Sequence, residues 1–99
     1  MAASVLLASV DRDITGAEVS LRIIGSREPP TNMVIQIAIT GTADVHIQGR
    51  IARDAPWQLL GETHSTSAII HVKAVQFLRA VTLNVAEGAK VSVWADWGW

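Results

Sequence analysis

Residues 43–60 read ADVHIQGRIARDAPWQLL and contain two strand patterns joined by a tight connection. Apolar residues at alternate positions give the first half the period of a strand with one solvent face: Val45, Ile47 and Ile51. Pro56 then interrupts the ladder, because proline fixes φ and has no N–H to donate. Trp57 and Leu59 resume the alternation. The stretch therefore predicts a β-hairpin, and we expect Trp57 to be a core anchor.

Period-two patterns recur along the rest of the chain. The further strands that we expect cover residues 4–10, 17–23, 33–40, 68–72, 77–85 and 90–97. Residues 33–40 are apolar in both phases, which predicts a central strand or one covered by a partner. Turn residues separate the strands at intervals of about eight to twelve residues, as in sandwiches and barrels. We predict an all-β fold, a single jelly-roll-like β-sandwich over residues 1–99 with about eight antiparallel strands.

Composition limits the partners and the chemistry. The chain has 99 residues, of which 49% are hydrophobic, enough for one domain with its own core. Its net charge of −1 lacks the basic excess that binding to nucleic acid requires, so we expect no such partner. Cysteine is absent, which removes disulfides and cysteine-based metal sites. No apolar run approaches about 18 residues and no basic residue precedes the first apolar stretch, so we expect neither a membrane span nor a signal peptide.

The residue patterns do not indicate an active site. The histidines His46, His64 and His71 are the first candidates for a metal or a general base, but none lies at a local ligand spacing. His46 and His71 fall in expected strands and can meet across a sheet if those strands pair. No serine has a nucleophile-elbow context, and the acidic residues cluster at expected turns. We therefore predict no catalytic, cofactor-binding or metal-binding residues; a hydrolase, the remaining alternative, would need His46 or His71 for turnover.

The tryptophans carry more information. The chain has four Trp, one Phe and no Tyr, and three of the Trp lie in the last six residues. Trp97 shares the apolar phase of its strand, whereas Trp94 shares the phase expected to face water. Large exposed apolar patches are uncommon on free monomers. We expect Trp94, Trp97 and Trp99 to form an interface; the alternatives are that the rings cover this chain's own sandwich, or that Trp94 or Trp99 is a platform for sugar stacking.

Four short runs resemble small β-sandwich structural proteins encoded in the virion modules of tailed bacteriophages. The runs are VHIQGR (45–50), APWQLLG (55–61), FLRAV (77–81) and GAKVSVW (88–94). In that family a strand ending in glycine leads to a loop, a tryptophan and an apolar pair, and a later strand with an aromatic-Leu-Arg pattern pairs with a final V-x-V strand. The resemblance covers roughly the last sixty residues.

This resemblance implies a non-enzymatic virion structural protein made in the host cytoplasm. It implies a capsid decoration, cement or head accessory protein that self-associates and binds a protein lattice such as the major capsid protein. A neck or tail accessory protein is the alternative within the same class. The pattern is also similar to discoidin-type and carbohydrate-binding sandwiches, so an adhesion module that uses the C-terminal tryptophans is the second alternative. No catalytic residue is carried over.

Overall fold

Nine strands and no helix make up the part of the chain that the structure, a computed structural model, describes: residues 2–21, 32–72 and 75–98. The strands are β1 (Ala2–Val10), β2 (Ile14–Thr15), β3 (Val19–Ser20), β4 (Asn32–Thr40), β5 (Asp44–Arg50), β6 (Gln58–Leu59), β7 (Ala68–Val72), β8 (Phe77–Leu83) and β9 (Lys90–Gly98). In these residues there is no helix of the length and hydropathy needed to cross a membrane. The predicted all-β class is confirmed.

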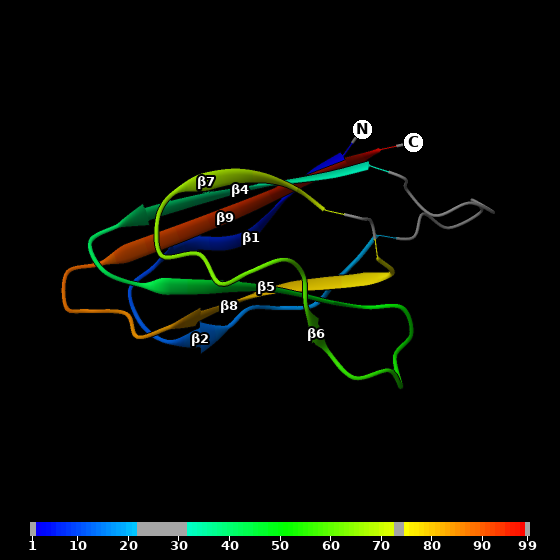
Figure 1. Ribbon diagram of the computed structural model, residues 1–99, viewed down its shortest axis with the longest axis horizontal. Coiled ribbons are helices and arrows are strands. Elements are labelled where there is room, and N and C mark those ends of the chain that lie inside the picture. The colour runs from blue at the N-terminus through cyan, green and yellow to red at the C-terminus, as the bar shows by residue number, and fades with distance from the viewer. Residues whose placement is uncertain (1, 22–31, 73–74, 99) are drawn as a thin grey trace.

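The strands form two antiparallel sheets that lie one above the other in Figure 1. Sheet A has the order β1-β9-β4-β7. Sheet B has β8 and β5 at its centre, with β6 beside β5 and both β2 and β3 beside β8. The strand predicted over residues 33–40 is β4, and it is central in sheet A, as expected.

The pairings describe one long double ribbon that is folded around the 43–60 hairpin. At its closed end β5 pairs with β6; then β4 pairs with β7, β8 with β2 and β3, and β1 with β9. Winding this ribbon brings β4 against β9 and β5 against β8, which completes the two sheets. With β2 and β3 counted as one interrupted strand, this is the eight-strand jelly roll of two four-stranded sheets. The jelly-roll-like sandwich is therefore confirmed.

The core lies between the sheets and consists of the inward phase of each strand. In β5, for example, Val45 and Ile47 are buried while the residues between them are partly exposed. Thr82 of β8 is buried and polar, and both functions of its hydroxyl are used. Its oxygen accepts the N–H of Ile14 at 2.9 Å, and the hydroxyl donates to the carbonyl oxygen of Arg12 at 2.8 Å. These bonds tie the edge of sheet B to its centre.

Two details of the predicted strands are wrong. The alternation predicted through Ile51 fails because β5 ends at Arg50, and Ile51 is 77% exposed in the turn that follows. The strand predicted over residues 17–23 is short: β3 has two residues, and residues 22–23 lie outside the described part of the chain. The hairpin itself is confirmed, with Gln48 opposite Leu59.

Candidate interaction surface

A row of residues with three large apolar side chains crosses the outer face of sheet A. Val5 of β1 lies opposite Trp94 of β9, Trp94 lies opposite Gln36 of β4, and Gln36 lies opposite Ile69 of β7. Val5 is 55% exposed, Trp94 is 39% exposed and Ile69 is 64% exposed. All four strands contribute to this row, which we call the Trp94 row. It places an apolar strip where a solvated sheet face would carry polar side chains.

The outward position of these side chains follows from the packing of the strands. In β9 the alternation that buries Val93 and Ala95 directs Trp94 to the opposite face. In β1 the register shifts between Val5 and Leu7, and this bulge places two consecutive leucines in the core while Val5 stays outside. The side chains of the Trp94 row are therefore exposed because their neighbours along each strand pack in the core.

A shallow hollow of about 330 Å³ lies between the apolar groups of the row. Its lining residues are Val34, Gln36, Ile69, Trp94, Ala95 and Asp96. The next row of the sheet supplies Asp96 of β9, opposite Val34 of β4, which is opposite His71 of β7. The outer face therefore combines an apolar strip with one carboxylate and one imidazole, placed on the two sides of β4.

The three predicted interface residues, Trp94, Trp97 and Trp99, do not share one surface. Trp94 is on the surface, as its phase indicated. Trp97 is buried in the core cluster, because it shares the phase of Val93, and it has no place on the outer face of sheet A. An interface role for the ring of Trp97 is therefore corrected to a core role. Trp99 lies outside the described residues.

Trp57 is not the core anchor that the sequence predicted. Trp57 and Leu59 do share a phase, but it is the outward one: Leu59 is 45% exposed, while Leu60 packs against the core. The ring of Trp57 is half-buried on the outer face of sheet B. The guanidinium carbons of Arg50 and Arg79 lie over it at 4.4 and 4.2 Å from its centroid. These are cation–π distances, so Trp57 is held by arginines and not by the core.

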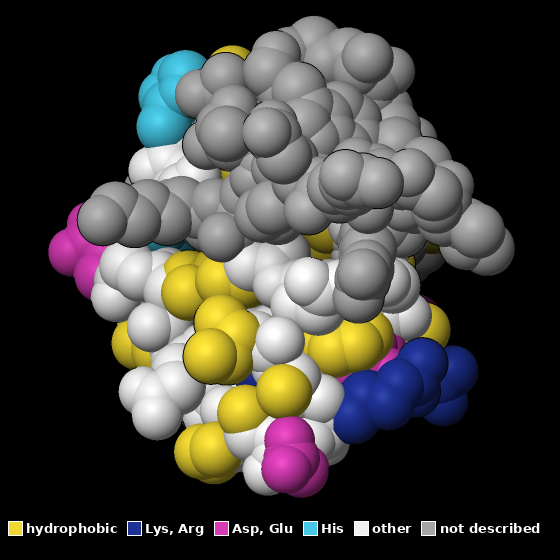
Figure 2. Space-filling view, turned by 90° about the vertical axis from the view of Figure 1, so that its right-hand side faces the viewer, with side chains coloured by type: hydrophobic (Ala, Val, Ile, Leu, Met, Phe, Trp, Pro, Cys, Tyr) yellow, Lys and Arg dark blue, Asp and Glu magenta, His cyan; other side chains and the backbone are white. Residues whose placement is uncertain are grey.

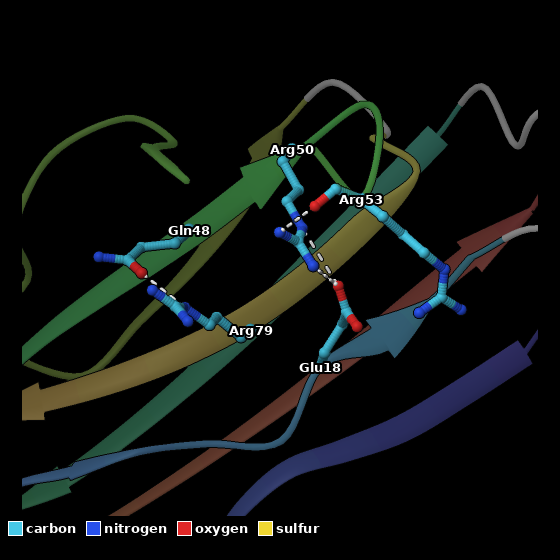
Figure 3. A network of polar contacts seen from close by, with 5 residues as sticks. All are labelled: Glu18, Gln48, Arg50, Arg53 and Arg79. Atoms are coloured by element: carbon cyan, nitrogen blue, oxygen red, sulfur yellow. Dashed lines mark hydrogen bonds and ion pairs between the residues drawn. The ribbon is translucent and has the colours of Figure 1, made fainter. Parts of the chain in front are cut away.

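A polar network fixes the same arginines (Figure 3). Arg50 donates to a carboxylate oxygen of Glu18 at 2.6 Å and to the carbonyl oxygen of Arg53 at 2.8 Å. The Nε of Arg79 donates to the amide oxygen of Gln48 at 2.7 Å. Arg53 and Arg79 lie on opposite sides of Arg50 and do not converge on a common point. The bond to Arg53 ties the loop after β5 to that strand, and the guanidinium of Arg79 in β8 lies over the ring of Trp57 in the same loop.

Basic side chains form a group at the end of the molecule that carries the loop after β5. Viewed from that end, a group of Lys and Arg side chains lies at one side, next to hydrophobic side chains (Figure 2). The network of Figure 3 contains three arginines, Gln48 and one carboxylate, that of Glu18. It lies on the outer face of sheet B.

His46 lies apart from the other two histidines, whereas His64 and His71 line the same hollow. His46 lies in β5 of sheet B and His71 in β7 of sheet A, so the two do not meet across a sheet. His64 is held by two backbone hydrogen bonds with Val45, at 2.8 and 3.0 Å, and it lines a hollow of about 340 Å³ with Glu62 and His71. Within residues 2–21, 32–72 and 75–98, no group of three His, Cys, Asp or Glu is arranged to hold a metal ion.

One carboxylate has a perturbed pKa. Asp44 accepts hydrogen bonds from the side-chain amide of Asn84 at 3.0 Å and from the hydroxyl of Ser65 at 2.9 Å. Both bonds favour the charged form, the one from Asn84 more strongly, and they lower the pKa of Asp44 below its ordinary value of 3.8. Asp44 thereby joins the start of β5 to the turns after β6 and β8.

Sequence reasoning found one member of the Trp94 row and missed the other two apolar members. Val5 lies in a run that is apolar in both phases, and Ile69 was read only as part of a β-branched strand. Their alignment with Trp94 depends on strand pairing across long stretches of sequence. No family model, curated protein or solved structure matches the chain.

Proposed function

We propose that this chain is a non-enzymatic structural protein that works by associating with protein surfaces through the outer face of sheet A. The observation that carries the proposal is the Trp94 row, in which three large apolar side chains are exposed on one rigid sheet face. Burying such a strip against another protein removes apolar area from water, and tryptophan is among the residues that contribute most to protein interfaces. Association is thus the use that this face fits best.

The class of protein that we propose is a virion structural subunit, located in the virion. It would be a capsid decoration, cement or head accessory protein that self-associates and binds a lattice such as the major capsid protein; a neck or tail accessory protein is the other position in the same class. Two facts support this assignment. The sequence runs quoted above resemble such proteins, and the jelly roll is an architecture that viral capsid domains use.

A glycan-binding module is the second candidate, and a specific observation favours it. The exposed ring of Trp94 lies beside the amide of Gln36 and the carboxylate of Asp96, around the same shallow hollow. A flat ring flanked by hydrogen-bonding groups is suited to a sugar. The jelly roll also occurs in lectins. The two candidates use the same residues, so the test must measure both self-association and sugar binding.

The test is the oligomeric state of the full chain and of a Trp94→Ser variant, measured by size-exclusion chromatography with light scattering. We expect the parent to be larger than a monomer and the variant to shift toward the monomer with an unchanged melting temperature. Ile51→Ser is the matched control, since it also removes a large exposed apolar side chain but lies in the loop after β5. A monomeric parent, or an assembly that Trp94→Ser leaves intact, contradicts the proposal. A monomeric parent whose Trp emission changes with added oligosaccharide favours the glycan module.

A further inference from the structure

We infer that the occupant of this face is a second copy of the chain, packed face to face. The two-fold axis lies between the two facing sheets, directly above β4 and parallel to it. The inference rests on the proposed function and specifies its geometry. A two-fold interface brings the same patch of both subunits together, so the patch must be self-complementary. Two rows matter here: the Trp94 row, and the next row, which contains Asp96, Val34 and His71. Together they are self-complementary when the axis lies along β4.

The positions follow from the register of the sheet. β9 and β7 flank β4 on its two sides, so a rotation of 180° about β4 places β9 of one copy over β7 of the other. Because the axis runs along the strands, each row faces itself. Trp94 then faces the partner's Ile69, since both are in the row of Gln36. Asp96 faces the partner's His71, since both are in the row of Val34.

The facing groups match chemically. The ring of Trp94 and the partner's Ile69 cover apolar area on each other. The carboxylate of Asp96 accepts a hydrogen bond from the imidazole of the partner's His71. Gln36 lies on the axis and faces its own copy, and an amide has both donors and an acceptor for such a pair. Each contact except the one on the axis occurs twice.

Other axes match only part of the surface. An axis across the strands at the Trp94 row would stack Trp94 on its own copy, but it would leave Asp96 facing the partner's Ser92. An axis across the strands midway between Ser92 and Trp94 would pair Asp96 with the partner's Lys90, but it would set the indole ring against the hydroxyl of Ser92. The axis along β4 matches apolar with apolar and acid with base at once.

The axis along β4 overlaps three strands of each copy, β9, β4 and β7, because β1 lies beyond β7 of the other copy. Three strands spaced about 4.8 Å apart and up to nine residues long, at about 3.3 Å per residue, form a face of at most about 430 Å². Two such faces bury at most about 860 Å² in total, which is in the range of weak, transient contacts, so we expect a weak dimer. Aligned sheets pack with their strands about 30° apart, which keeps the two rows near the axis within side-chain reach.

The experiment is a double-mutant cycle on the dissociation constant of the full chain, measured by analytical ultracentrifugation. His71→Asp sets a carboxylate against the partner's Asp96 at two places per dimer, and we expect it to weaken the dimer by about tenfold or more. Asp96→Asn is isosteric and removes the repulsion, so the double variant should recover to within about threefold of Asp96→Asn alone. Melting temperatures check that each variant is folded.

The controls distinguish two claims: that the outer face of sheet A forms the dimer, and that the two-fold axis runs along β4. Lys90→Glu should leave the dimer unchanged, whereas a weaker dimer in this variant supports the axis midway between Ser92 and Trp94 and overturns the one along β4. Additive effects of His71→Asp and Asp96→Asn also overturn the axis along β4. If Trp94→Ser dissociates the protein while the cycle is additive, the proposed function stands and the two-fold geometry fails. If Trp94→Ser has no effect, both fail.

Discussion

Gly49 sits at a buried, inward position of β5, where a strand would normally carry a larger side chain. A Cβ at this position would lie 2.7 Å from a methyl carbon of Val75 and 2.9 Å from a methyl carbon of Leu60. Both distances are shorter than real carbon contacts. The end of the leucine side chain can move, but the methyl groups of Val75 are fixed close to its backbone. We therefore predict that Gly49→Ala destabilises the protein by overpacking.

The magnitude follows from two opposing effects. Extra carbon in a packed core costs about 1–3 kcal/mol, whereas replacing glycine by alanine restricts the unfolded chain and returns about 0.4–1 kcal/mol. The net loss should lie between about 0 and 2.6 kcal/mol. For a domain of this size each kcal/mol lowers the melting temperature by about 4–8 °C. Urea unfolding followed by tryptophan fluorescence and circular dichroism measures it.

The matched variant is Val75→Ala, which removes both methyl carbons that obstruct a Cβ at Gly49. The double variant should be more stable than the sum of the two single effects predicts, with a favourable coupling of about 0.5–3 kcal/mol. If Gly49→Ala is more stable than the parent, or if the two changes add, the space beside Gly49 is not what excludes a side chain there.

Two further predictions concern the polar contacts. Trp57→Ala should lower the free energy of unfolding by about 1–3 kcal/mol, measured by thermal unfolding. The variant loses two cation–π contacts worth about 0.5–1 kcal/mol each and some partly buried ring area. A loss above about 4 kcal/mol would show that the ring is a core anchor. Asp44 has a lowered pKa, so its bonds with Asn84 and Ser65 stabilise the protein above about pH 4, and this contribution is lost as the pH falls through the lower, folded-state pKa. Asp44→Asn should make the free energy of unfolding fall less steeply with acid below pH 4, with Ser65→Ala giving a partial effect; an unchanged pH profile would contradict this role.

The strand patterns were sufficient to predict the architecture. The patterns at residues 33–40 and 90–97 predict the central strands of sheet A, and those at 43–50 and 77–85 predict the central strands of sheet B. Most of these segments alternate because a strand with one buried face must alternate, and 33–40 is apolar in both phases. The patterns failed where tertiary contacts decide the outcome. Trp57 is an example, since its phase match with Leu59 was correct, but nothing local indicates that Leu60 and not Leu59 faces the core.

The interaction surface was predictable only in part, for a related reason. Trp94 stands out because the inward phase of its strand is unambiguous, with Val93 and Ala95 on either side. Val5 belongs to a stretch that is apolar in both phases, and a bulge decides which side chain turns outward. The row that joins Val5 to Trp94 requires a register between strands about 90 residues apart in sequence, and local patterns carry no register.

The two outer faces of the sandwich differ, and the difference supports our proposal that sheet A is the associating face. The outward positions of β5 carry polar or charged side chains, and the last of them, Arg50, bonds to Glu18 and lies over the ring of Trp57. That face satisfies its large aromatic side chain within the chain. The outward positions of sheet A carry Trp94 and Ile69 on opposite sides of β4, with no side chain of the described residues covering either one completely. The tryptophan ring on the outer face of sheet B is therefore held by arginines of the same chain, whereas the tryptophan ring on the outer face of sheet A stays exposed.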